Sequence, residues 1–166
     1  RDGGALWRLR FNDVTKPLSG ANLTMILDGS EAPYLNKPDN LEIDAYGNIF
    51  IEEDPGINEH RSRLIVFNPA TSKFTVLATA KKRYFAALGA DYLTNNEELT
   101  SVVDVSRHLR ASKSDKKTYL VFSIQIHTDV ARTRPDITNP TALGKLWPAF
   151  RGGQLYLVVI DWSKLP

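Results

Sequence analysis

The stretch from Asn36 to Gly56 constrains the fold most, because its residue order predicts both a strand pair and a site. Leu41 and Ile43 alternate with polar neighbours, and Ile49-Phe50-Ile51 is an apolar run rich in β-formers. Between them lies Ala45-Tyr46-Gly47-Asn48, whose glycine suits a reversal with positive φ. The stretch therefore predicts two short strands joined by a tight turn.

Three consecutive carboxylates follow the apolar run, at Glu52, Glu53 and Asp54. Neighbouring carboxylates repel one another, so their position at the end of a buried strand favours a neutralising cation or basic side chains nearby. A solvated acidic loop is the simpler interpretation of such a triplet. On these residues alone, both interpretations stay open.

Apolar runs bounded by turn residues continue along the chain. Leu64–Phe67 and Phe74–Leu77 flank the turn residues Asn68–Thr71, so Leu41 to Leu77 predicts four antiparallel strands in one sheet. Four such strands form one blade of a β-propeller. Further strands are predicted at Leu6–Phe11 and Leu23–Leu27, and within Leu99–Val105, Lys117–Ile124 and Gln154–Asp161.

We therefore expect an all-β chain that forms a partial β-propeller of about two to three antiparallel blades. Residues 1–37 would hold the outer strands of one blade, residues 38–80 a complete blade, and residues 94–166 a further blade with long insertions. A closed ring needs about four or more blades, so missing sequence or another chain would complete it. A compact two-sheet sandwich is the structural alternative.

Three segments give weaker signals. Apolar residues cluster around Tyr84 to Leu93 and indicate a helix without clear caps. Ser106 to Lys116 is a basic, polar insertion, and Thr128 to Gly153 is a long connection without a predicted regular structure.

Composition excludes several classes of protein. The net charge is +2 with scattered Lys and Arg, which makes nucleic acid a poor partner because phosphate tracking needs a basic stripe. No apolar run approaches the length of a membrane span. The chain has no cysteine, which excludes disulfides, thiolate metal ligands and a cysteine nucleophile within it.

Two groups of residues resemble a known family. Pro38-Asp39-Asn40-Leu41, then Asp44 with Gly47-Asn48, then Glu53-Asp54, is similar to the signature of the PhoX-type alkaline phosphatases and their β-propeller relatives. Asn96 to Val102, followed by Tyr119 to Gln125, resembles the family's later Glu-containing segment and its following strand.

This resemblance implies a propeller channel in which an iron and calcium cluster cleaves small phosphate monoesters. It places Glu53 and Glu98 as metal ligands, with Asp54 and Asn40 as secondary candidates, and Ca²⁺ or Fe³⁺ as the cofactor. The alternatives are a surface carboxylate for Glu53, a helix or turn cap for Glu98 and a turn cap for Asn40.

Other polar residues lie close to these motifs. Gln125 and His127 are two residues apart on a predicted strand, so both would face the same side and could point into the channel. Arg61 and Arg63 could bind phosphate, although ion pairs with the neighbouring acids are the more usual role of such arginines.

The resemblance thus implies the C-terminal part of a PhoX-like, metal-dependent phosphoesterase, and it implies a location outside the cytoplasm. The second hypothesis is a non-catalytic propeller that acts as a structural or interaction subunit. The third is a calcium-dependent lactonase-type propeller. The family's cluster also uses a cysteine, which this chain lacks. The expected partners are the remainder of the propeller or a second chain, and a small phosphate ester if the protein is an enzyme.

Overall fold

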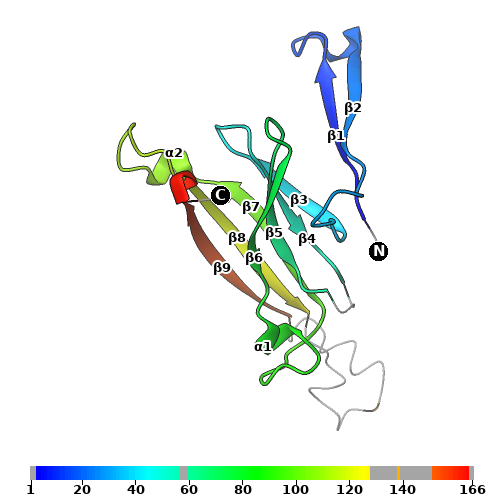
Figure 1. Cartoon of the computed structure of the whole chain (residues 1–166), viewed down its shortest axis with the longest axis vertical. Coiled ribbons are helices and arrows are strands. Elements are labelled where there is room, and N and C mark those ends of the chain that lie inside the picture. Colours follow the sequence, from blue (N-terminus) through cyan, green and yellow to red (C-terminus); the bar gives the residue numbers. More distant parts are fainter. Residues whose placement is uncertain (1–2, 57–59, 128–137, 139–150, 165–166) are drawn as a thin grey trace.

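The structure is a computed structural model that describes residues 3–56, 60–127, 138 and 151–164. Within these residues the chain is mostly β and forms antiparallel sheets of two, four and three strands (Figure 1). The strands are β1 (Leu6–Phe11), β2 (Ala21–Leu27), β3 (Pro38–Ile43), β4 (Ile49–Glu53), β5 (Arg63–Asn68), β6 (Lys73–Thr79), β7 (Glu97–Asp104), β8 (Thr118–His127) and β9 (Arg151–Ile160). The short helices are η1 (Pro17–Ser19), α1 (Lys82–Phe85), α2 (Ser106–Leu109) and η3 (Trp162–Lys164). The all-β prediction is therefore confirmed.

The four-stranded sheet has the order β3-β4-β5-β6, as the sequence predicted for Leu41 to Leu77. Its first turn is held by Asp44, whose Oδ1 accepts hydrogen bonds from the Tyr46 and Asn48 backbone N–H groups at 2.9 Å. Gly47 takes a φ of 80° there, a conformation that costs other residues more than glycine.

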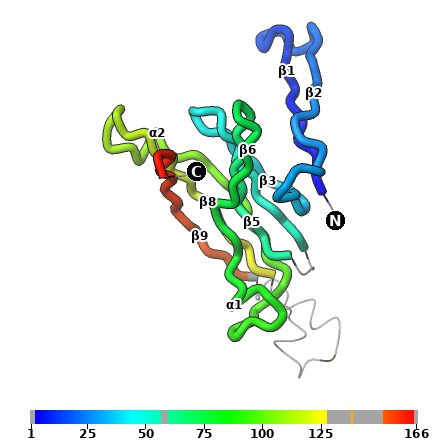
Figure 2. The backbone as a smooth tube through the Cα atoms, in the orientation of Figure 1, coloured from blue at the N-terminus to red at the C-terminus, as the bar shows by residue number. Residues whose placement is uncertain are grey.

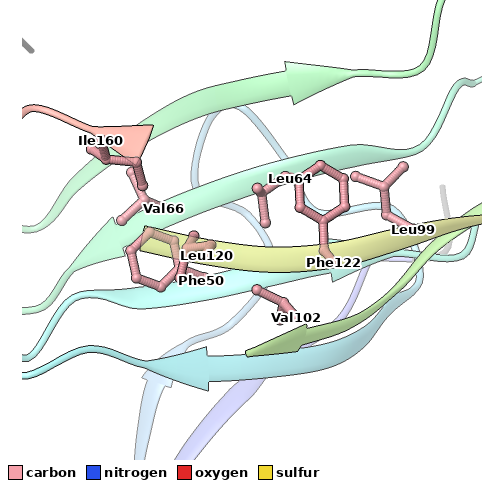
Figure 3. Close-up of a cluster of buried hydrophobic side chains, with 8 residues drawn as sticks. All are labelled: Phe50, Leu64, Val66, Leu99, Val102, Leu120, Phe122 and Ile160. Carbon is pink, nitrogen blue, oxygen red and sulfur yellow. The ribbon is translucent and has the colours of Figure 1, made fainter. Parts of the chain in front are cut away.

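Strands β4 and β5 are buried on both faces, which explains why they read as continuous apolar runs. Alternate residues enter two different clusters. Figure 3 shows the cluster between the four-stranded and three-stranded sheets, which comprises Phe50, Leu64, Val66, Leu99, Val102, Leu120, Phe122 and Ile160. The cluster on the other face of the four-stranded sheet comprises Leu27, Leu35, Ile51, Ile65 and Phe67.

The three-stranded sheet has the order β7-β8-β9. The β7–β8 register shifts between Thr100 and Val103, where Ser101 has a φ of 65°. Strand β9 begins at Arg151, three residues before the predicted strand, and pairs with β8 along its whole length.

The two larger sheets stack face to face, and their edge strands β3 and β7 lie side by side. Two adjacent propeller blades and a two-sheet sandwich both accommodate this arrangement. Within the described residues the sheets close neither a barrel nor a propeller ring.

The β1–β2 hairpin projects away from the stacked sheets (Figures 1 and 2). Its base packs on the second cluster through Leu6, Ile26 and Leu27, whereas Trp7 and Leu23, which lie farther along the two strands, are 52% and 63% exposed. The predicted outer blade strands thus form a sheet of their own.

The predicted helix around Tyr84 to Leu93 is wrong apart from its first two residues, because α1 ends at Phe85. The chain turns back on α1 here: a Cβ on Gly89 would lie 2.3 Å from the Arg83 carbonyl oxygen. Most of the predicted connection Thr128 to Gly153 lies outside the described residues.

Candidate functional site

The end of β4 and the beginning of β7 lie at the same end of the stacked sheets. Ser62, immediately before β5, links the two sheets at this end. Its backbone N–H donates to Glu97 Oε1 at 3.0 Å, and its hydroxyl donates to the Glu97 carbonyl oxygen at 2.6 Å. The next residue, Arg63, pairs with Glu53. The two sequence motifs therefore share one end of the stacked sheets.

Glu53 is fully buried and held by a basic side chain. Arg63 donates from Nε to Glu53 Oε2 at 2.7 Å and from Nη2 to Glu53 Oε1 at 2.6 Å. The Asn36 backbone N–H adds a third hydrogen bond at 2.8 Å. This bidentate pair neutralises the carboxylate, as expected for a partly buried Arg–Glu pair. The ion-pair interpretation of Arg63 is thus the one that the structure shows.

Glu98 lies on the outer face of the three-stranded sheet. Its neighbours Glu97 and Leu99 point into the interior, where they are 1% exposed, so strand alternation directs Glu98 the other way. Its cross-strand partner is Gln125, and its Oε1 lies 4.0 Å from His127 Nε2.

Glu98 belongs to a group of half-buried polar side chains that we call the polar stripe. Thr100 pairs with Ser123 and Glu98 with Gln125, so these side chains share one face, and Gln125 and His127 point to the same side as predicted. The members of the polar stripe are Glu98, Thr100, Ser123, Gln125 and His127. Carboxylate, amide, hydroxyl and imidazole groups of this kind can coordinate a hard cation or hydrogen-bond an oxyanion.

The structure does not bring Glu53 and Glu98 together. Glu53 and Arg63 lie on the face of the four-stranded sheet that is turned away from β7, next to Pro33 and Tyr34. Glu98 lies on the outer face of the other sheet. The family resemblance placed both residues as metal ligands, but one cation held by both carboxylates does not fit this placement.

The secondary candidates make local contacts. Asp54 Oδ1 accepts a hydrogen bond from the Gly56 N–H at 3.1 Å, as in an Asx turn. Asn40 Nδ2 donates to Asp39 Oδ2 at 3.0 Å and to Thr100 Oγ1 at 3.4 Å. Asn40 therefore reaches the polar stripe across the β3–β7 seam, and Asp54 caps a turn.

Two buried carboxylates that the sequence did not single out as site residues form hydrogen bonds between the two sheets. Glu52 Oε2 accepts a hydrogen bond from the Val102 N–H of the opposite sheet at 3.0 Å, and Glu97 Oε1 accepts one from Ser62. Each adjoins a predicted ligand in the sequence, so strand alternation was the signal that could have found them. We call Glu52 and Glu97 the reciprocal carboxylates.

Burial perturbs both reciprocal carboxylates. Loss of hydration raises the pKa of Glu52 from 4.5 to about 7, against the lowering effect of the Val102 hydrogen bond, and the nearby Asp39 charge raises it further. Burial raises the pKa of Glu97 to about 6. Its hydrogen bonds with Ser62 and the charge of Arg61 lower this pKa and so offset part of the effect of burial. These groups are thus poised to change protonation near neutral pH.

Within the part of the chain that the structure describes, no three His, Asp or Glu side chains are grouped so that they could hold a metal ion. The roles of Glu53, Glu98, Asp54 and Asn40 toward Ca²⁺ or Fe³⁺ stay predictions. In the same residues, no helix has the length and apolar character that crossing a membrane requires.

Comparison with known proteins adds no relative from which a role could be carried over. No protein-family model matches the chain, and neither a curated protein nor a solved structure matches it.

Proposed function

We propose that the chain supplies two adjacent blades of a metal-dependent phosphoesterase of the PhoX type, which acts on small phosphate monoesters. The polar stripe carries this proposal. Five half-buried polar side chains converge on one end of a sheet face whose opposite side is an apolar core. Polar side chains are usual on the outer face of an antiparallel sheet, but a half-buried carboxylate, amide and imidazole on neighbouring strands are also the groups that a cation or phosphate site uses.

Glu98 is the residue on which the proposed activity depends most. It supplies the carboxylate of the stripe, and Asn40 adds an amide from the neighbouring sheet. When bound, a Ca²⁺ or Fe³⁺ ion would act as a Lewis acid toward the phosphoryl oxygens. Asn40, Gln125 and Glu98 are the side chains of this chain that would hold the ion or position the ester.

The test is hydrolysis of p-nitrophenyl phosphate by the protein as its gene encodes it, with Ca²⁺ and Fe³⁺ supplied and then removed by a chelator. Glu98→Gln should lower the rate by about 100-fold, as loss of a key electrostatic group does. Glu42→Gln removes a carboxylate from β3, outside the polar stripe, and is the matched control. Equal rates in the two variants would overturn the assignment of Glu98.

A second candidate function is a non-catalytic structural or interaction subunit. The capture of Glu53 by Arg63 favours it, because this carboxylate is no longer available as a ligand without breaking a buried ion pair. Exposed apolar strands favour it too, notably Trp7 on β1 and Leu155 on β9. Absence of hydrolysis with every metal supplied, together with a native mass larger than one chain, would select this function over the first.

A further inference from the structure

A cavity of about 380 Å³ lies on the opposite side of the four-stranded sheet from the polar stripe. It is bounded by the segment before β3 and by the start of β5. The polar residues that line it are Tyr34, Asn36, His60, Arg61, Arg63 and Thr79. We call this space the basic cavity, because its described lining holds two arginines and a histidine and no carboxylate.

Each arginine of the basic cavity has a carboxylate near it, on the side away from the cavity. Arg63 is neutralised by Glu53, which lies behind it and is itself fully buried. Arg61 feels the charge of Glu97, whose carboxylate is occupied on one oxygen by the Ser62 N–H. Neither carboxylate is among the described residues that line the cavity, so a ligand would meet the arginine side of each pair.

The hydrogen-bond donors of the basic cavity are also incompletely used. Asn36 Nδ2 is buried and has no acceptor in the described part of the chain. Arg61 donates from Nη1 to the Ala80 carbonyl oxygen, and its other N–H groups have no hydrogen-bond acceptor among the described residues. A buried donor without an acceptor is costly, so an incoming oxygen atom would be favoured at this position.

The Arg63 guanidinium is held in place in the wall of the basic cavity. Its guanidinium donates to both Glu53 oxygens and to the carbonyl oxygens of Pro33 and Tyr34, at 3.2 and 2.6 Å. A group fixed in this way needs little reordering when a ligand binds, which lowers the entropic cost of binding. The cavity therefore combines one wall fixed by hydrogen bonds with N–H donors that have no acceptor in the described part of the chain.

We propose that the basic cavity binds a small oxyanion through Arg61 and Asn36. Guanidinium and amide N–H groups recognise the oxygens of a phosphate, sulfate or carboxylate group, and the cavity has room for such a group or for a larger molecule that carries it. This proposal does not depend on phosphoesterase activity, since the cavity is separated from Glu98 by both sheets.

Calorimetric titration of the protein with inorganic phosphate, sulfate and acetate at low ionic strength tests this. We expect saturable binding of at least one anion, and Arg61→Gln should weaken it about tenfold by removing a charge-assisted donor. Arg83→Gln is the matched control, because Arg83 is exposed and pairs with Asp91 elsewhere. Preference for phosphate and sulfate over acetate would identify a tetrahedral oxyanion, and the reverse preference a carboxylate.

Chemical-shift mapping by NMR supplies a measurement that does not rely on a variant. The anion should perturb the backbone amides of Asn36, Arg61 and Thr79. No saturable binding, binding that is unchanged in Arg61→Gln, or perturbations confined to other residues would overturn the proposal. Anion binding without ester hydrolysis would support it while the phosphoesterase proposal fails, and hydrolysis that depends on Glu98 without anion binding here would do the reverse.

Discussion

Single residues on one strand have opposite roles in this chain. Glu53 forms a bidentate ion pair with Arg63. Its neighbour Glu52 accepts a hydrogen bond from the opposite sheet through Oε2, and its Oε1 has no hydrogen-bond partner in the described residues. Strand alternation separates them, because successive side chains point to opposite faces. An acidic run therefore cannot be assigned one function as a unit.

The first prediction concerns the pH dependence of stability. The folded-state pKa of Glu52 lies above its ordinary value of 4.5, so its contribution to stability is present below pH 4.5 and is lost as the pH rises through about 7. Glu52→Gln removes this ionisation and should raise the free energy of unfolding at pH 8 by about 3 kcal/mol relative to the native protein. Urea unfolding between pH 4 and 9 measures it.

Glu97→Gln is the internal comparison for that series. Its pKa is raised only to about 6, so its effect should be smaller and complete at a lower pH. Plots of unfolding free energy against pH that run parallel for the Glu52→Gln variant and the native protein would contradict the prediction. They would show that the pKa of Glu52 is the same in the folded and unfolded states.

The hairpin at the start of the four-stranded sheet shows what local sequence determines. Gly47 lies at its tip with a φ of 80°, and no heavy atom would contact an added Cβ within 4 Å. The second prediction is that Gly47→Ala destabilises the protein by about 1 kcal/mol through backbone strain alone. Gly152→Ala, on β9 without positive φ, is the control and should be neutral. Equal midpoints of urea unfolding for both variants would contradict this reason.

The strands were predictable because their signals are local. Ile49-Phe50-Ile51 and the Asn68–Thr71 turn determine strands and reversals within a few residues, and the four-stranded sheet follows from them. The extent of α1 and the separation of Glu53 from Glu98 depend on contacts between distant segments. The motif alone therefore could not predict which face of a sheet a carboxylate occupies or whether an arginine contacts it.

At the scale of the molecule, apolar surface remains uncovered. Leu155, Leu157 and Val159 form a row on the outer face of β9 and are 71%, 56% and 48% exposed. The intervening residues Tyr156 and Val158 pack into the core, so the row is the alternate face of a strand that has apolar residues on both sides. Such a row on a terminal strand of a sheet favours association.

The third prediction is that the 166-residue chain produced alone associates as its concentration rises. Leu157→Lys should shift this equilibrium toward the monomer by placing a charge within the row. Leu109→Lys, at a similarly exposed leucine on α2, is the control. Analytical ultracentrifugation reads the outcome. A native chain that stays monomeric at every concentration would refute the prediction.

The hydrogen bond from Val102 to Glu52 also has a consequence for the entropy of folding. In an unfolded chain this hydrogen bond closes a loop of 50 residues. Once the four-stranded sheet has formed, the loop that remains to be closed is the connection between β6 and β7, which is the 17 residues from Ala80 to Asn96. Closure entropy grows with the logarithm of loop length, so prior formation of that sheet lowers the cost of docking by about 1 kcal/mol. The connectivity of the chain thus favours a route in which local strand pairing comes first and the two sheets join afterwards.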